Sequence, residues 1–214
     1  MSGTAIKPHD GVVLVVAAIS QELSRFRPSA GVRTLLTGMG CARARTAVEA
    51  FLQKEPVSRI LSVGFCGGLD PALKAGQPVW VDSVTSLEGS SRRQAAVWRG
   101  KMKSEWPQAV LLTVDCPVKS PSEKAILRGQ SSAHVVDMET CAIAEIAERH
   151  GIPWNGLRVV LDPANQVLEV ESPLAAIQML ARPDGWRRLF SFLKQLRFAG
   201  AVLADSLNEL TTTR

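Results

Sequence analysis

Apolar runs of strand length alternate along the chain with stretches in which apolar residues recur every three or four positions. The short apolar runs predict buried strands at 12–19, 32–40, 58–69, 74–84, 109–115, 133–139 and 154–162. The periodic stretches predict helices at 41–55, 120–129 and 140–151, the second capped by Ser120 or Ser122 and the third by Gly151. Such alternation is typical of an α/β layer fold, with the strand at 58–69 entering a glycine-rich loop.

The remaining segments have weaker patterns. Residues 19–26 predict a short helix or a turn after the first strand. The polar segment 86–108 predicts a loop and an edge hairpin. From Pro173 the chain has a helical pattern in two pieces, divided by the turn sequence RPDG at 182–185. We expect residues 1–10 to be a disordered N-terminus.

Length and composition indicate a single α/β domain over residues 1–214, because 46% of the residues are apolar and can form a full core. The net charge of +5 favours anionic partners only mildly, since the basic residues are dispersed. No nucleic-acid motif accompanies them, so no nucleic-acid partner is expected.

The cysteines and the first ten residues indicate the cellular compartment and whether a metal site is expected. Cys41, Cys66, Cys116 and Cys141 lie too far apart in sequence for a CxxC pair or for zinc-ligand spacing. We therefore predict no metal and a reduced, cytoplasmic chain. The first ten residues lack a signal-peptide pattern, and no apolar run is long enough to span a bilayer.

Polar residues and glycines gather where the predicted strands end, which is where open α/β sheets bind ligands. The candidates are Ser20–Glu22, Gly38–Gly40, Gly64–Gly68, Asp115, Asp137–Glu139 and Asp162. Each has a plainer interpretation alone: acids near helix starts, an Asp-Pro turn, or glycines in a tight turn. Their shared position in successive units favours a ligand site.

The three carboxylates suit different chemical tasks. Glu22 can act as a general base toward water or a hydroxyl, and Asp162 as a proton donor to a leaving group. Glu139 can accept two hydrogen bonds from a sugar diol. Met138 can pack against a sugar or fill the core.

Several segments resemble one superfamily in order and spacing over residues 12–165. VVDMETCAIAEIAERHGIP, LRVVLDPAN, TGMGCARARTAVEAFL and ILSVGFCGGLDPALKAGQPVWVDSV are similar to motifs of the purine nucleoside phosphorylase and methylthioadenosine/S-adenosylhomocysteine nucleosidase superfamily. The resemblance implies a three-layer fold with a central mixed, twisted sheet flanked by helices. It further implies cleavage of an N-ribosyl bond, no cofactor, water or phosphate as the co-substrate, and a homo-oligomer.

The last third of the chain resembles the hopanoid-associated branch of that superfamily. LLTVDCPVKSPSEKAIL and the segment from SPLAAIQML to AVLADSL carry this likeness. Members of the branch are thought to remove adenine from adenosylhopane during hopanoid lipid synthesis. The resemblance therefore implies a lipid-linked adenine nucleoside as substrate. A small nucleoside such as methylthioadenosine or S-adenosylhomocysteine, or a non-catalytic nucleoside-binding role, are the alternatives.

The superfamily's residue roles transfer to matching positions. The resemblance implies that Glu139 binds the ribose hydroxyls and that Met138 packs against the ribose. It implies that Asp162 protonates the purine at N7 and that Glu22 orients the attacking water. The base-binding backbone corresponds to Pro117 and Val118, and the loop near base and sugar to Phe65, Cys66 and Gly67.

Two departures from the superfamily pattern make the site less polar. Phe65 stands where many relatives have a serine, and Leu161 replaces a small residue before Asp162. Both suit a lipid-linked substrate and weaken a phosphate site, and the second is expected to raise the pKa of Asp162. Glu22 favours hydrolysis, whereas nearby arginines offer a phosphate cradle: Arg25, Arg27, Arg43 and Arg45.

The segment 186–207 combines apolar and basic residues on a helical pattern. Leu189, Leu193, Leu196 and Leu203 fall near one face, with Arg187, Arg188, Lys194 and Arg197 interspersed. A basic amphipathic helix can bind an anionic lipid surface, which predicts a peripheral membrane contact. The other interpretation is a helix packed on the sheet.

Overall fold

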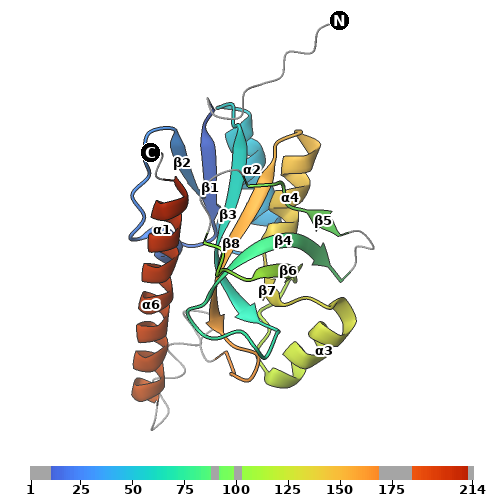
Figure 1. The fold of residues 1–214 in the computed structure, drawn as a ribbon, viewed down its shortest axis with the longest axis vertical. Coiled ribbons are helices and arrows are strands. Elements are labelled where there is room, and N and C mark those ends of the chain that lie inside the picture. The colour runs from blue at the N-terminus through green and yellow to red at the C-terminus, as the bar shows by residue number, and fades with distance from the viewer. Residues whose placement is uncertain (1–10, 88–91, 99–102, 169–184, 212–214) are drawn as a thin grey trace, which may run out of the picture.

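The computed structural model describes residues 11–87, 92–98, 103–168 and 185–211 (Figure 1). Strands and helices follow one another in the order expected from the sequence. The strands are β1 (Val13–Ala17), β2 (Val32–Leu36), β3 (Arg59–Gly68), β4 (Pro78–Ser86), β5 (Arg93–Gln94), β6 (Gln108–Thr113), β7 (Val135–Asp137) and β8 (Trp154–Asp162). The helices are α1 (Ser20–Leu23), α2 (Cys41–Leu52), α3 (Pro121–Ser131), α4 (Thr140–Arg149) and α6 (Gly185–Thr211).

The strands form one mixed sheet, as the superfamily resemblance predicts. Its order is β2-β1-β3-β7-β6-β4-β5, and β8 pairs with both β3 and β4. The β1–β3 and β3–β8 pairs are parallel, whereas β3–β7 and β4–β8 are antiparallel. The long strand β3 therefore lies at the centre, where β1, β7 and β8 all pair with it.

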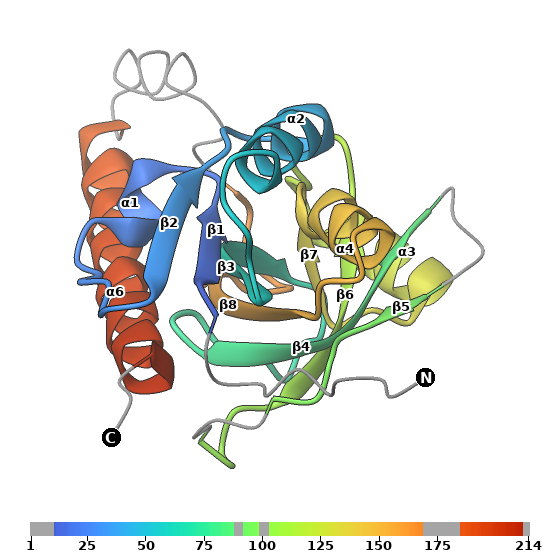
Figure 2. The ribbon, with the colours of Figure 1, turned by 90° about the horizontal axis from the view of Figure 1, so that it is seen from above.

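Helices cover both faces of the sheet, which gives the predicted three layers (Figure 2). Ala44 and Val48 of α2 and Ile143 of α4 are buried in one core cluster with residues of β1, β3 and β4. Leu203 and Leu207 of α6 belong to a second cluster, together with residues of β1, β3 and β8. Burial of apolar side chains against both faces holds the sheet between these helices.

The glycines of VGFCGGL continue a strand instead of forming the loop expected from the sequence. β3 extends through Gly68, with a register shift between Cys66 and Gly67 where it pairs with β8. A shift of this kind is a β-bulge, and bulges re-aim neighbouring side chains. The ends of β3 and β8 therefore stay paired up to the carboxylate of Asp162.

Other boundaries differ by a few residues from those expected. The helix predicted to 55 ends at Leu52, and the C-cap of α4 is His150, with Gly151 following at φ +65°. A glycine fits there because left-handed backbone carries no side-chain penalty for it. The predicted edge hairpin is confirmed, since β5 pairs antiparallel with β4 at the edge of the sheet.

The C-terminal helix α6 is continuous from Gly185 to Thr211. Its second half packs on the sheet, with Leu203 and Leu207 both 0% exposed. Its first half bears exposed apolar side chains, of which Phe190 is 73% exposed and Leu193 45%. Within the described ranges, no helix is long and apolar enough to cross a membrane. The first predicted C-terminal piece and residues 1–10 lie outside the described residues.

Candidate active site

Glu22 is buried beside the centre of β3. It lies in the short helix α1 and is only 5% exposed. One carboxylate oxygen accepts the backbone N–H of Phe65 at 2.9 Å, and the other accepts those of Ala18 and Ile19 at 2.8 and 3.0 Å. Burial raises the pKa of Glu22, while these N–H groups and Arg158 act in the opposite direction. The carboxylate is thus fixed in place by three backbone N–H groups.

Gly64 makes room for that carboxylate. A Cβ at Gly64 would stand 2.3 Å from Oε1 of Glu22, and its φ of +156° disfavours any residue with a side chain. The glycine that the sequence places in a turn is therefore needed for the close approach of α1 to β3.

Glu139 lies at the start of α4, directly after β7. Its Oε1 accepts the backbone N–H of Gly40 at 2.7 Å. This hydrogen bond joins the start of α4 to the start of α2, although the two residues are 99 positions apart in sequence. Burial and the charge of Asp137 raise the pKa of Glu139 to about 7, against the opposing effects of the Gly40 N–H and Arg158. Met138 is half-buried beside it, and its carbonyl oxygen accepts a hydrogen bond from the Cys41 thiol.

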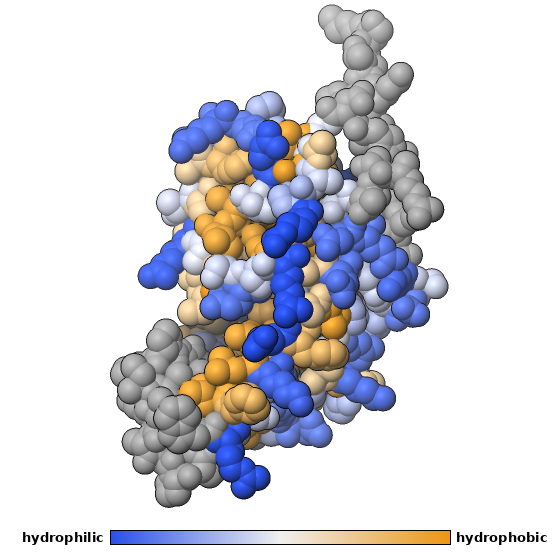
Figure 3. All heavy atoms as spheres, turned by 90° about the vertical axis from the view of Figure 1, so that its left-hand side faces the viewer, coloured by the Kyte–Doolittle hydropathy of each residue, from blue (hydrophilic) through white to orange (hydrophobic). Residues whose placement is uncertain are grey.

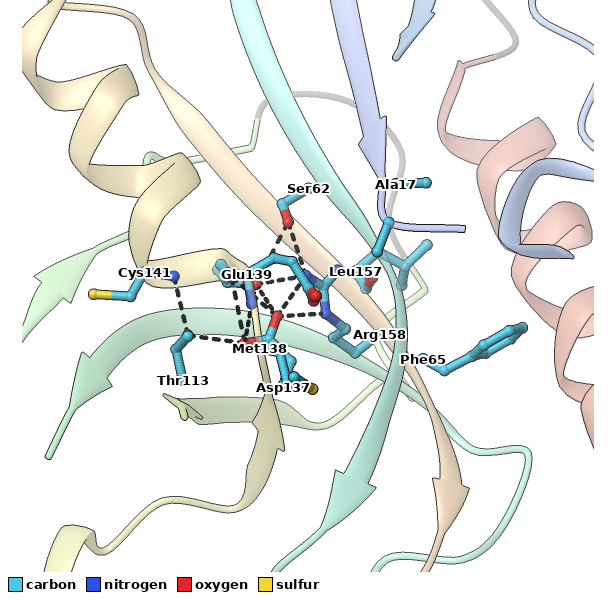
Figure 4. A network of polar contacts seen from close by, with 12 residues as sticks. Ala17, Ser62, Phe65, Thr113, Asp137, Met138, Glu139, Cys141, Leu157 and Arg158 are labelled. Carbon is cyan, nitrogen blue, oxygen red and sulfur yellow. Dashed lines mark hydrogen bonds and ion pairs between the residues drawn. The ribbon is translucent and has the colours of Figure 1, made fainter. Parts of the chain in front are cut away.

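A buried arginine joins the turn before α4 to the sheet (Figure 4). Arg158 of β8 is 2% exposed, and its Nη2 lies 2.8 Å from Oδ2 of Asp137. The same nitrogen donates to Ser62 Oγ at 2.8 Å and Thr140 Oγ1 at 2.5 Å. The charges of Glu22 and Glu139 also act on Arg158. A buried arginine thus balances a cluster of carboxylates.

Asp137 has a structural part in this network. Besides Arg158, its carboxylate accepts the Thr113 hydroxyl at 2.8 Å and the backbone N–H of Thr140 at 3.1 Å. These contacts use both of its oxygens and hold the turn that carries Glu139. Asp137, one of the strand-end candidates, is thus held within the protein by these contacts.

Asp162 ends β8 four residues after Arg158. It is 6% exposed, and burial raises its pKa to about 6 even though Lys124 lowers it. Gly67 pairs with Asp162 in the β3–β8 register, and a Cβ at Gly67 would stand 3.5 Å from its Oδ2. The expected rise in the pKa of Asp162 is confirmed, with overall burial as its main cause. A carboxyl group of this kind can hold a proton near neutral pH.

Lys124 of α3 is the counter-charge of Asp162. Its side chain is 0% exposed, and its Nζ lies 2.6 Å from Oδ2 of Asp162. The three hydrogen bonds of this ammonium group go to the carbonyl oxygens of Asp162, Pro163 and Gln166, at 3.1, 2.8 and 2.9 Å. Oδ2 of Asp162 is therefore ion-paired with the ammonium group.

The other predicted binding residues lie around these carboxylates in different ways. The ring of Phe65 points away from the Glu139–Arg158 network toward α6 (Figure 4), while its backbone N–H holds Glu22. Cys66 is 4% exposed and lies in a core cluster, so only its backbone can face a ligand. Pro117 and Val118 are half-buried between β6 and α3, where Val118 packs against a third apolar cluster.

The four arginines proposed as a phosphate cradle are not drawn together. Arg45 pairs with Glu145 at 2.5 Å, and Arg27 donates to the carbonyl oxygen of Phe26. Arg25 and Arg43 are exposed, with the Arg43 side chain lying beside Gly38. The buried cations nearest the carboxylates are instead Arg158 and Lys124, both already paired with an acid.

Sequence reasoning missed Arg158 and Lys124. Arg158 interrupts the apolar run WNGLRVVLD, and a charge inside a buried strand requires a partner, so this signal was available. Lys124 gave no signal, because the polar helix start SPSEK predicts an exposed lysine. Only the packing of α3 against the end of β8 places Lys124 beside Asp162.

A small cleft opens next to Asp162 on the side of α6. It is lined by Leu161, Asp162, residues 166–168 and the α6 residues Ser191, Phe192 and Gln195. Gln195 donates to the carbonyl oxygen of Leu161, which ties α6 to the end of β8. The exposed first half of α6 is thus continuous with the surroundings of Asp162.

Comparisons with known proteins agree with this fold. The family model described as the phosphorylase superfamily matches residues 29–98 and 100–182. A 5′-methylthioadenosine/S-adenosylhomocysteine nucleosidase from Neisseria meningitidis, solved with methylthio-immucillin-A, has a TM-score of 0.71 at 18% identity, covering 94% of this chain and 98% of that one. The corresponding nucleosidase from S. pneumoniae has a TM-score of 0.67 at 15% identity, covering 92% and 99%.

A mutant futalosine hydrolase from Helicobacter pylori has the same fold. Its TM-score is 0.67 at 15% identity, covering 94% of this chain and 100% of that chain. Comparison of the sequence with curated proteins gave no significant match. At these identities the solved structures establish the fold, and the sequence-based family match establishes the lineage.

Proposed function

Because the chain belongs to the phosphorylase superfamily, we propose that it cleaves the N-glycosidic bond of an adenine nucleoside and releases adenine. The proposal assigns three carboxylates to three tasks. Glu22 is the general base, Glu139 binds the ribose hydroxyls, and Asp162 is the acid that protonates the purine. Met138 packs against the ribose beside Glu139.

One observation carries this proposal: two of the three acids, Glu22 and Asp162, lie against the same strand, β3. Gly64, which adjoins Glu22, and Gly67, which adjoins Asp162, are three residues apart on β3. Three residues of strand span about 10 Å. A nucleoside along β3 would have its sugar at Glu22 and Glu139 and its purine at Asp162.

The reaction that suits these positions is hydrolysis through a positively charged sugar. The bond between C1′ of ribose and N9 of adenine breaks, and its electron pair leaves with the purine. Asp162 donates its proton at N7 and so neutralises the departing base. Water adds to C1′, and Glu22 takes the proton that the water loses. Each positioned proton transfer contributes roughly 10²–10⁴-fold in rate.

Water is favoured over phosphate by the charges near the sugar side. Glu22 and Glu139 are both acidic, and Arg158 is engaged by Asp137 at 2.8 Å. A phosphate dianion there would face two carboxyl groups without a free cation among the described residues that line the network. The backbone N–H of Phe65, at a position where many relatives have a serine, is already bonded to Glu22.

The favoured substrate is a lipid-linked adenine nucleoside, with adenosylhopane as the specific proposal. Phe65 and Leu161 are both half-buried and pack with the apolar cluster under α6. An apolar tail leaving the ribose could follow this side of the molecule. The resemblance to the hopanoid-associated branch points to the same substrate. Methylthioadenosine is the second candidate, because the N. meningitidis structure is of a 5′-methylthioadenosine/S-adenosylhomocysteine nucleosidase.

The first half of α6 provides the surface on which such a substrate would arrive. Its exposed apolar residues are Phe190, Leu193 and Phe198, and its exposed basic residues are Arg187, Lys194 and Arg197. Figure 3 shows apolar and hydrophilic side chains mixed on the face that α6 presents. Apolar side chains ringed by basic ones suit the interface of an anionic membrane.

Vesicle binding tests this contact on the full chain. Co-sedimentation with vesicles containing an anionic phospholipid should decrease at least several-fold for Phe190→Ser with Leu193→Ser. The control is Ile126→Ser, which removes an apolar side chain of α3 that is 59% exposed. Equal binding by all three proteins would reject the membrane contact.

Adenine release tests the activity and ranks the substrates. The protein should release free adenine from adenosylhopane faster than from methylthioadenosine or adenosine at equal concentration. A higher rate with methylthioadenosine would reject the lipid-linked substrate and keep the activity. No adenine from any of the three would reject the proposed function.

A further inference from the structure

Lys124 occupies a position that stability alone does not explain. It is the largest side chain in the described residues that is almost completely buried, at 0% exposure. Lysine is rarely buried, because desolvating its ammonium group is costly even when an acid is near. An apolar residue in the second turn of α3 would fill the same volume at lower cost. The retained charge therefore points to a role at Asp162.

The start of α3 is built to fix this lysine. Ser120 caps the helix by accepting the backbone N–H of Glu123 at 3.2 Å, and Glu123 accepts the N–H of Ser120 at 3.0 Å in return. Pro121 occupies the first turn. A reciprocal cap with proline leaves the helix start little freedom. Because Lys124 lies one residue beyond Glu123, its stem leaves the helix in a fixed direction.

The ammonium group then holds the segment that follows β8. Its three donors are directed at the carbonyl oxygens of Asp162, Pro163 and Gln166, and an ammonium has three N–H bonds to give. Oδ2 of Asp162 lies 2.6 Å from the same nitrogen and is ion-paired with it. Lys124 thus positions the backbone that carries the acid and pairs with its carboxylate.

We propose that Lys124 is the positioning residue for Asp162: it fixes the segment that carries the acid, and its charge limits how far burial favours the protonated carboxyl. This inference rests on the proposed function, in which Asp162 is the acid. Lys124 itself does not touch the substrate. Its two effects are separable, because the hydrogen bonds act on geometry and the charge acts on protonation.

The surroundings of Asp162 allow the effect of the Lys124 charge on the Asp162 pKa to be measured. Among the described residues, the charged and titratable groups that interact with it are Lys124 from α3 and the Cys66 thiol from β3. On the α6 side, Gln195 is uncharged. The Cys66 thiol stays neutral, since burial raises its pKa above the ordinary value. Lys124 is therefore the one nearby charge in these ranges whose removal should change the titration of Asp162.

The direction of the change follows from the sign of the charge. A cation beside a carboxylate favours its ionised form, so removing Lys124 should raise the pKa of Asp162. A close opposite charge is worth about one to three pH units. Lys124→Gln removes the charge and keeps an N–H donor for the carbonyl oxygens. Lys124→Met removes both the charge and the hydrogen bonds.

The experiment follows the Asp162 carboxyl by carbon NMR on protein labelled with ¹³C-aspartate, using Asp162→Asn to assign its signal. We expect the titration midpoint to rise by at least about one unit in Lys124→Gln. The control Lys103→Gln removes a half-exposed lysine that pairs with Glu209, and should leave the midpoint unchanged. An unchanged midpoint in Lys124→Gln would overturn the proposal. If that variant does not fold, Lys124→Met gives the same comparison.

Kinetics separate this proposal from the proposed function. If the wild type releases adenine, the alkaline limb of its pH–rate profile should move upward in Lys124→Gln by the same amount as the NMR midpoint. A purely structural lysine would lower the rate at every pH without moving that limb, which would also overturn the proposal. If the wild type releases no adenine, the proposed function fails, whereas the NMR midpoints still decide whether Lys124 controls Asp162.

Discussion

Replacing Glu139 by glutamine should stabilise the protein at alkaline pH while impairing its activity. Glutamine keeps the size of the side chain and an oxygen for the Gly40 N–H, which now binds Oε1 at 2.7 Å. What it removes is the cost of ionising a buried group. Glu139 should bind ribose as a carboxylate, so the site maintains a charge that the fold disfavours.

The magnitude follows from the raised pKa. The pKa of Glu139 rises from 4.5 to about 7, and each unit corresponds to about 1.4 kcal/mol. The unfolded chain releases this proton above pH 4.5 and the folded protein only above about pH 7, so stability falls as pH rises through that window. The glutamine variant escapes this loss. At pH 8 it should gain roughly 1–3 kcal/mol, because solvent reaches part of the side chain.

Thermal unfolding followed by circular dichroism measures the effect. For a chain of this length, about 1 kcal/mol shifts Tm by roughly 2–4 °C, so Glu139→Gln should unfold about 3–10 °C higher at pH 8. The gain should nearly vanish at pH 4.5. The exposed control Glu105→Gln should change Tm little at either pH. A Glu139→Gln protein with a Tm equal to or below the wild type at pH 8 would refute the reasoning.

Four further predictions concern the same network. Asp162→Asn and Glu22→Gln should each lower kcat for adenine release by roughly 10²–10⁴-fold with the fold retained by circular dichroism, and full activity in either would remove that residue from the mechanism. The rate should fall as pH rises above about 6, where Asp162 loses its proton, and a profile without that limb would contradict its role as the acid. Gly64→Ala should abolish activity, because the added Cβ would lie 2.3 Å from Oε1 of Glu22. The control Gly129→Ala should keep its activity, because its Cβ would meet nothing within 4 Å. Equal activity in both variants would argue against the close approach of Glu22 to Gly64. Arg158→Met should lose roughly 3–5 kcal/mol of stability in urea unfolding by leaving Asp137 buried and unpaired, and a loss below about 1 kcal/mol would show that the pair does not hold the site together.

The sequence predicted the order of elements and the strand-end positions of the acids well, because both follow from local patterns. Alternation of apolar runs with helical periodicity identified the layers. The capping pattern offered Ser120 or Ser122 as the N-cap of α3, and the structure has Ser120 there. Glu139 at a strand-to-helix junction stood out for the same reason. Each of these features is encoded within a few neighbouring residues.

What the sequence could not provide were contacts between distant segments. Lys124 pairs with a residue 38 positions away, and Glu139 binds the N–H of Gly40, 99 positions away. The role of Gly64 depends on the side chain of Glu22, which fills the space that a Cβ would need. The local pattern therefore predicted a loop for Gly64, Gly67 and Gly68, although all three belong to β3.

The most direct test of the account is the nature of the co-substrate. Wild-type protein and Asp162→Asn are incubated with adenosylhopane and with methylthioadenosine, with and without phosphate, and the products are identified by mass spectrometry. The account predicts free adenine and an unphosphorylated sugar from the wild type at the same rate in both buffers, with little product from Asp162→Asn. Adenine that appears only with phosphate, together with a sugar 1-phosphate, would contradict hydrolysis at Glu22.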